Sequence, residues 1–239
     1  MMTRILMAGV ALALLAAPAN ARLQLSISAG GTTFTCFDGQ LSCDQSGGAN
    51  NLLIVDQTVG GAFVQLALTQ STFGAPDELQ LSTSNIENLT AAPLTVVLTA
   101  SDTGYAFPIK AINNSASLTF NSNIGAPDST LTFFADTLDG QGAPGTPGTL
   151  LESVSGHAVT DPDSFSGSKI TPFDADAPFS MTESASLVLR ADGSITGFNQ
   201  SMESAPVPEP STWAMMLVGF AGLGWGAWSR KRVRTLAAL

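Results

Sequence analysis

Between Leu23 and Phe198 the chain consists of short runs in which apolar and polar residues alternate. Leu23, Leu25 and Ile27 alternate with glutamine and serine, which is the period-2 pattern of a strand with one buried face. Similar runs recur at Leu52–Val55, Ala62–Thr69, Glu78–Ser84, Leu94–Ala100, Ala116–Asn121, Thr130–Ala135, Phe179–Arg190 and Ser194–Phe198. No window in this region sustains an apolar stripe at helical spacing, so the pattern predicts a domain built of strands.

Clusters of glycine, proline and aspartate separate these runs and supply turn residues. Asp192-Gly193, which joins Leu187–Arg190 to Ser194–Phe198, is the strongest hairpin signal in the chain. The stretch Gly140–Gly148 is rich in glycine and proline and predicts a loop. Many short strands with such turns predict an all-β domain, an antiparallel β-sandwich of which the jelly roll is one form.

The first 21 residues have the features of a secretory signal peptide. Arg4 supplies the positive start, Ile5–Ala17 the apolar stretch, and Ala19-Asn20-Ala21 a cleavage site. We therefore predict a signal peptide at 1–21, an exported domain at 22–200 and a loose linker at 201–206.

Cys36 and Cys43 are the only cysteines, and the turn signal Asp38-Gly39 lies between them. In the oxidising compartment that the signal peptide implies, an isolated pair at this spacing predicts a structural disulfide. Because the closed loop is short, the expected stabilisation is about 2–3 kcal/mol.

The last 33 residues contain three parts in a fixed order. A proline-rich motif comes first: Val207, Pro208, Glu209, Pro210 and Ser211. The two prolines hold the backbone of this motif extended. An apolar stretch follows, from which we predict a single hydrophobic transmembrane helix at 212–229, with Trp213 and Trp228 at the two membrane interfaces. The tail at 230–239 then carries four cations that should stay cytoplasmic: Arg230, Lys231, Arg232 and Arg234.

This order of parts resembles the PEP-CTERM sorting signal, and the resemblance covers the C-terminal tail alone. In that family, the tail is recognised by a membrane enzyme called exosortase, which removes it during export. The resemblance implies a protein that is anchored transiently in the inner membrane and then reaches the cell surface or the extracellular space. Family members are typical of bacteria that make exopolysaccharide and biofilm. An ordinary permanent membrane anchor is the alternative interpretation of the apolar helix.

The expected exported region is strongly acidic. Between Arg22 and Ala205 it contains four basic and eighteen acidic residues, a balance of −14. Such a surface repels phosphate backbones, which argues against nucleic-acid binding.

The sequence offers few residues for catalysis. His157 is the only histidine, no G-x-S-x-G motif is present, and both cysteines are assigned to the disulfide. Phosphate-binding loops, dinucleotide fingerprints and zinc-ligand spacings are also missing. We therefore predict a protein that is not an enzyme and that needs no cofactor.

Carboxylates are the remaining residues that could bind a metal ion or take part in catalysis. Two D-x-D pairs, Asp161 with Asp163 and Asp174 with Asp176, lie in a stretch expected to be rich in loops, and oxygen ligands of this kind can hold calcium. Solvated turn aspartates are the simpler interpretation, because neither an EF-hand nor a G-G-x-G-x-D repeat is present. Paired carboxylates would also suit a glycoside hydrolase. The exported region has no tryptophan and a single tyrosine, Tyr105, which counts against an aromatic sugar-binding platform.

Three hypotheses follow. The first is an exported, non-enzymatic surface or extracellular-matrix protein that an exosortase-type enzyme processes and that contacts extracellular polysaccharide. The second is a secreted carbohydrate-binding module or weak hydrolase. The third is a permanently anchored membrane protein.

Overall fold

The structure is a computed structural model that describes residues 22–74, 76–105, 108–142, 145–176, 178–206, 216–218 and 220–221. The expected signal peptide, the motif at 207–211 and the basic cluster at 230–234 lie outside these residues, as does most of the expected helix at 212–229. Met216–Val218 and Phe220–Ala221 are helical and exposed. Over the residues that are described, no helix combines the length and the apolar character needed to cross a membrane.

The described residues form twelve strands, and alternation of buried and exposed side chains accounts for most of them. In chain order they are β1 (Gln24–Ala29), β2 (Thr32–Phe37), β3 (Leu52–Val59), β4 (Ala62–Thr72), β5 (Glu78–Asn88), β6 (Leu94–Tyr105), β7 (Ile109–Asn121), β8 (Ser129–Asp136), β9 (Thr149–Gly156), β10 (Asp163–Ala175), β11 (Phe179–Leu189) and β12 (Ser194–Pro206).

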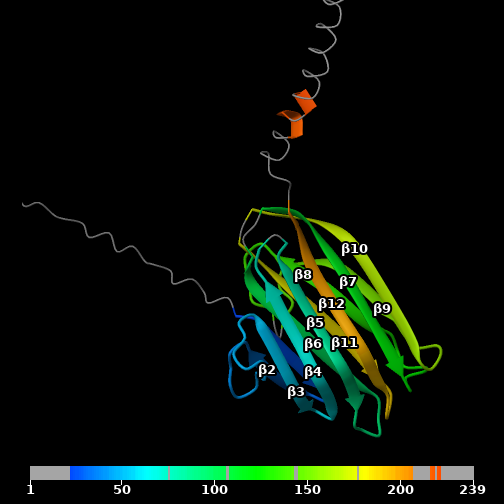
Figure 1. Cartoon of the computed structure of the whole chain (residues 1–239). Coiled ribbons are helices and arrows are strands. Elements are labelled where there is room, and N and C mark those ends of the chain that lie inside the picture. Colours follow the sequence, from blue (N-terminus) through cyan, green and yellow to red (C-terminus); the bar gives the residue numbers. More distant parts are fainter. Residues whose placement is uncertain are drawn as a thin grey trace, which may run out of the picture.

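The strands are arranged in two antiparallel sheets that pack face to face (Figure 1). Sheet A has the order β2-β1-β6-β11-β8-β9, and sheet B has the order β10-β7-β12-β5-β4-β3. The prediction of an all-β antiparallel sandwich is confirmed. From β5 to β8, successive strands alternate between sheet B and sheet A, so neighbours in a sheet are often distant in sequence.

A continuous hydrophobic core fills the space between the sheets. Its largest fully buried side chains include five aromatic residues: Tyr105, Phe120, Phe133, Phe179 and Phe198. The rings of Tyr105 and Phe179 lie 5.5 Å apart, and that of Phe73 stacks on Tyr105 at 5.0 Å. These residues come from strands of both sheets, so the core joins the layers.

Two glycine turns meet at the end of the sandwich opposite the C-terminus of β12. Gly30-Gly31 connects β1 to β2 and Gly60-Gly61 connects β3 to β4, all with positive φ, as tight hairpin turns require. A Cβ on Gly60 would lie 1.8 Å from the carbonyl oxygen of Ala29. Only glycine permits the two hairpins to approach this closely.

The predicted hairpin at Asp192-Gly193 is wrong, although the turn itself exists. Gly193 N donates to Arg190 O at 3.0 Å, but β11 belongs to sheet A and β12 to sheet B. The chain therefore crosses between the sheets at this turn. A turn signal identifies the reversal of the chain, whereas the choice of partner strand depends on contacts distant in sequence.

The loose linker expected at 201–206 is also wrong, because β12 continues to Pro206. These residues pair with β5 on one side and β7 on the other, as in Met202↔Leu79 and Ala205↔Ala111. Met202 and Ser204 are buried. Alternation of inward and outward side chains therefore extends through the segment.

The stretch around the two D-x-D pairs is mostly strand rather than loop. β10 runs from Asp163 to Ala175 and pairs with β7, while β9 at Thr149–Gly156 pairs with β8. Both strands lie at sheet edges. At such edges, serine, glycine and charged side chains weaken the apolar alternation that marked the other strands.

Candidate functional site

The last strand holds the chain in place up to the expected sorting motif. Ser204 N donates to Asp77 O, and Asp77 N donates to Ser204 Oγ, both at 2.8 Å. Pro206 aligns with Ile109 of β7. The chain that leaves the sandwich at Pro206 therefore starts from a strand that is paired on both sides over most of its length.

Several loops gather at this end of the sandwich, which we call the tail-end face. It is defined by Phe73, Leu138, Asp139 and Asp176. Phe73 follows β4, Leu138 and Asp139 follow β8, and Asp176 follows β10. β8 ends beside the start of β11, and β4 and β10 end near the end of β12. Leu138 is 87% exposed and Phe73 is 45% exposed. Asp139 Oδ1 accepts a hydrogen bond from Gly104 N at 2.7 Å. The face thus combines exposed apolar tips with carboxylates.

A buried polar cluster lies between the sheets near the same end. Ser71 Oγ on β4 donates to Asp102 Oδ2 on β6 at 2.5 Å, and both residues are buried. Burial raises the pKa of Asp102 to about 6, although the bonds from Ser71 and from Thr103 N oppose the shift. Burial also raises the pKa of Tyr105 well above its usual value, and the nearby carboxyl of Asp102 adds to this effect.

A second buried carboxyl, Glu183, lies in the middle of β11. It shares the core-facing side of the strand with Met181 and Ala185 and is fully buried. Burial raises its pKa well above the usual range, the charge of Glu78 adds to the shift, and the backbone amides of Leu81 and Met202 offset part of it. Burial in the core therefore favours the neutral form of Glu183.

The structure does not bring the two D-x-D pairs together. Asp161 and Asp163 lie at the start of β10, whereas Asp174 and Asp176 lie at its other end, roughly 35 Å away at ~3.3 Å per residue. Asp163 accepts hydrogen bonds from the backbone of Val159, Thr160 and Ser164, which lower its pKa. Asp174 pairs with Lys110. The described part of the chain contains no group of three or more histidine, cysteine, aspartate or glutamate side chains that would suit a metal ion.

His157 follows β9 at the end of the sandwich away from the tail-end face. Its Nδ1 atom is 2.6 Å from Asp128 Oδ1, and both side chains are at least half exposed. The described contact of His157 is thus a hydrogen bond at the surface.

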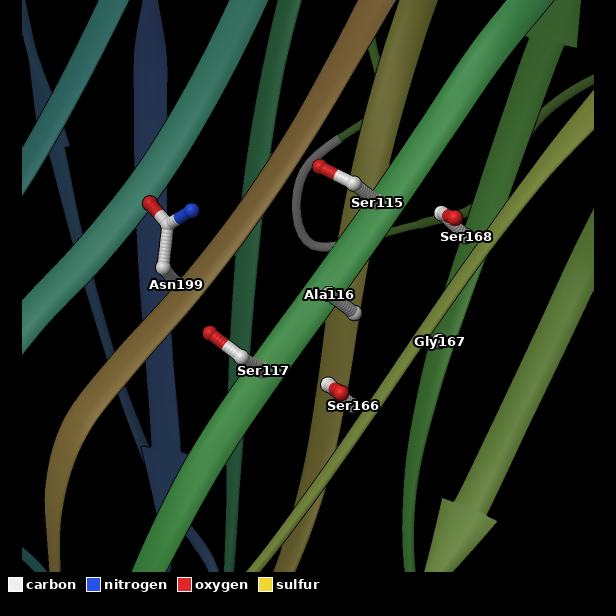
Figure 2. Close-up of a pocket in the computed structure, with 7 residues that line it drawn as sticks. All are labelled: Ser115, Ala116, Ser117, Ser166, Gly167, Ser168 and Asn199. Carbon is white, nitrogen blue, oxygen red and sulfur yellow. The ribbon is translucent and has the colours of Figure 1, made fainter.

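A shallow groove of about 420 Å³ crosses the outer face of sheet B (Figure 2). Ser115 and Ser117 on β7 align with Ser168 and Ser166 on β10, and Ala116 with Gly167 between them. Asn199 of β12 completes the lining. The lining residues carry hydroxyl and amide groups and no charge, so the groove suits a neutral, polar ligand.

The serine-lined groove and the buried Glu183 were not predicted from the sequence, although the sequence contains a signal for each. The matched triplets Ser115-Ala116-Ser117 and Ser166-Gly167-Ser168 place serines on one face of two strands. Similarly, Glu183 lies between Met181 and Ala185 at period 2, which places a carboxyl on an apolar face.

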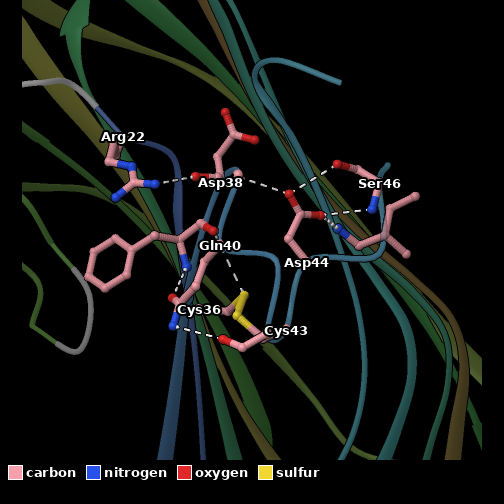
Figure 3. The surroundings of a disulfide bond; sticks show 11 residues. Arg22, Cys36, Asp38, Gln40, Cys43, Asp44 and Ser46 are labelled. Carbon is pink, nitrogen blue, oxygen red and sulfur yellow. Dashed lines mark hydrogen bonds between the residues drawn. A yellow bond between two sulfur atoms is a disulfide. The ribbon is translucent and has the colours of Figure 1, made fainter. Parts of the chain in front are cut away.

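The predicted disulfide between Cys36 and Cys43 is present, with a Cα–Cα distance of 6.0 Å (Figure 3). The loop beyond it is organised by Asp44, whose carboxylate accepts bonds from the backbone amides of Gly39, Ser46 and Ile54. These bonds lower the pKa of Asp44 although burial opposes the shift and is the largest single influence on it. The disulfide and this carboxylate therefore hold the same loop.

Comparison with protein families identifies the tail. The family described as PEP-CTERM protein-sorting motif matches residues 206–231. The chain thus carries a PEP-CTERM sorting motif at its C-terminus, beginning at the last residue of β12. This motif implies export, processing by an exosortase and sorting to the cell surface. No curated protein sequence matches the chain.

Solved structures give only distant likenesses. The structure of TmCBM61 in complex with beta-1,4-galactotriose has 8% identity and a TM-score of 0.32, and the match covers 57% of this chain and 87% of that one. Infectious bursal disease virus Gx strain has 13% identity and a TM-score of 0.36, with 87% and 55% covered. Carbohydrate binding module family29 has 10% identity and a TM-score of 0.22, with 78% and 95% covered. At TM-scores below 0.5, no property of these proteins transfers to this chain.

Proposed function

We propose that this chain, which ends in a PEP-CTERM sorting motif, is an exported, non-enzymatic surface or extracellular-matrix protein of a bacterium that makes exopolysaccharide or biofilm. The observation that carries the proposal is the motif at 206–231, which directly follows the last strand of a folded sandwich. An exosortase-type enzyme cuts the tail, and the acidic domain then acts at the surface or in the matrix outside the cell.

The arrangement of the polar residues supports a non-enzymatic role. The carboxylates at the surface are distributed over separate turns and strand ends, where several of them accept backbone hydrogen bonds. The carboxyls with strongly raised pKa values, Asp102 and Glu183, are buried between the sheets and away from the groove on sheet B. A glycoside hydrolase needs two carboxyls beside one substrate-binding cleft.

We infer that the last eight strands form a jelly roll. The support is the strand order: β5-β12-β7-β10 are consecutive neighbours in sheet B, and β6-β11-β8-β9 are consecutive neighbours in sheet A. Two interlocked four-stranded sheets with this alternation contain the two Greek keys of that architecture. Strands β1 to β4 then extend both sheets on one side.

Carbohydrate binding is the second candidate function, and the serine-lined groove favours it. Hydroxyl and amide groups without charge match the hydroxyls of a neutral glycan, whereas the acidic domain repels anionic polymers. Affinity electrophoresis in gels that contain a neutral polysaccharide tests this function. Retardation that is lost in the variant Ser117→Val/Ser166→Val, but kept in Ser186→Val on sheet A, would support it.

The intact mass of the protein recovered from the culture medium, the outer surface and the inner membrane tests the main proposal. We expect a product that begins at Arg22 and ends within 207–211, and additional mass at its C-terminus would identify a conjugate. A full-length tail found only in the inner membrane would contradict sorting and favour the third hypothesis, a permanent anchor.

A further inference from the structure

The distance between the sandwich and the membrane segment is limited by the sequence. Six residues, Val207–Thr212, separate Pro206 from Trp213, the first residue of the apolar run. An extended residue spans at most ~3.6 Å, so this connection reaches at most ~22 Å. A cut within Val207–Ser211 therefore lies no more than ~18 Å from the end of β12.

The connection between the sandwich and the apolar run is not lengthened by unpairing the end of β12. Releasing Glu203–Pro206 would break pairs with β5 and β7 together with the two hydrogen bonds between Ser204 and Asp77. It would also expose Ser204, which is 2% exposed in the folded domain. The sandwich therefore stays intact up to the start of the motif while the tail is processed.

An enzyme that cuts this close to a folded domain must contact it. A folded body of even 100 residues has a radius of gyration of ~13 Å, comparable to the reach available. We propose that the tail-end face is the docking surface for the exported side of the membrane enzyme that removes the sorting tail. This inference rests on the proposed function.

The side chains of the tail-end face indicate which groups on the enzyme would complement it. Leu138 and Phe73 present exposed apolar side chains, Asp139 follows Leu138 directly, and Asp176 follows β10 at the same end of the sandwich. Lys110, a cation at this end, is paired with Asp174. A partner with apolar contacts and basic groups fits this face, whereas the anionic headgroups of a lipid surface would be repelled by its carboxylates.

The test uses the full-length chain in its own host, with precursor and mature forms followed by pulse–chase and immunoblotting. The variant Leu138→Arg/Asp176→Arg changes the tail-end face. The matched control, Val159→Arg/Asp128→Arg, likewise replaces one exposed apolar residue and one exposed aspartate by arginine, but at the far end. We expect the first variant to be processed roughly tenfold more slowly, which is the effect of replacing an energetically dominant contact residue, and the control to be processed at the wild-type rate.

A second pair of variants separates docking from folding. A flexible insertion of about ten residues after Pro206 lengthens the connection by up to ~36 Å, so the enzyme no longer needs to touch the domain. The insertion should restore processing of the Leu138→Arg/Asp176→Arg variant. Equal rates for this variant and wild type, or equal slowing of the far-end control, would overturn the inference. Failure of the wild-type chain to be processed at all would instead overturn the proposed function.

Discussion

Ser71 on β4 donates a hydrogen bond of 2.5 Å to Asp102 on β6, and this contact links the two sheets inside the sandwich. Its acceptor is a carboxyl whose buried environment disfavours the charged form, which makes the stability of the domain depend on pH.

The first prediction concerns Asp102. Burial raises its pKa from 3.8 to about 6, so the folded domain keeps a proton that the unfolded chain releases. This stabilisation is complete below pH ~4 and is lost as the pH rises through ~6, and the shift corresponds to about 3 kcal/mol. Urea denaturation at several pH values should show the loss in wild type and a flatter profile in Asp102→Asn. Identical slopes for the two proteins would contradict the assignment.

Glu183 gives a second prediction, again with stability falling as the pH rises. The pKa of Glu183 in the folded state lies well above its usual value of 4.5. Above pH ~4.5 the unfolded chain releases this proton and the folded domain keeps it, so the stability of wild type falls with rising pH until Glu183 also ionises in the folded state. Glu183→Gln keeps the shape and stays neutral, so its advantage over wild type should grow by about 1.4 kcal/mol per pH unit. Glu203→Gln, at a half-exposed site on β12, is the control and should follow wild type.

The third prediction concerns the close approach of the two glycine turns, Gly30-Gly31 and Gly60-Gly61. Gly60→Ala places a methyl group 1.8 Å from Ala29 O and should destabilise the domain by more than ~4 kcal/mol or prevent folding. Gly31→Ala, at a similar positive φ but with nothing within 4 Å, should cost only about 1–2 kcal/mol. Thermal denaturation of both variants measures the difference. A comparable loss in the two proteins would show that backbone conformation, and not the contact, sets the cost.

The fourth prediction concerns the loop held by the disulfide and Asp44. Replacing both cysteines by serine should cost about 2–3 kcal/mol, because the closed loop is short. Asp44→Ala removes an acceptor of several hydrogen bonds in the same loop, so its cost should change by about 0.5 kcal/mol or more when the disulfide is absent. A double-mutant cycle of unfolding free energies measures this coupling, and strict additivity would refute it.

Alternation along the chain was sufficient to predict an all-β sandwich and most of its strands, because a strand with one buried face has a direct signature in sequence. Pairing between strands has no such signature. The turn at Asp192-Gly193 was correctly located, yet the strands on its two sides belong to different sheets. β11 pairs with β6 and β8 in sheet A, and β12 pairs with β5 and β7 in sheet B.

The sorting motif was predictable because its function depends on a contiguous segment. The buried carboxyls and the groove were not, since each depends on residues from several strands. Ser71 and Asp102 are 31 positions apart, and the two serine triplets meet only through the register of β7 and β10. The D-x-D pairs had the right residue types for a metal site, but the length of β10 keeps them apart.

The central place of β12 in sheet B has a consequence for the order of events during export. β5 and β7 are joined only through β12, which contributes the last residues of the domain. The sheet therefore remains in two halves until residues 194–206 have been translocated, when the sorting tail is the next segment of the chain to enter the export pathway. Completion of sheet B is thus a late, C-terminal event, and a chain that stalls before this point leaves one edge of β5 and one edge of β7 without a partner strand, open to aggregation and to proteases outside the inner membrane.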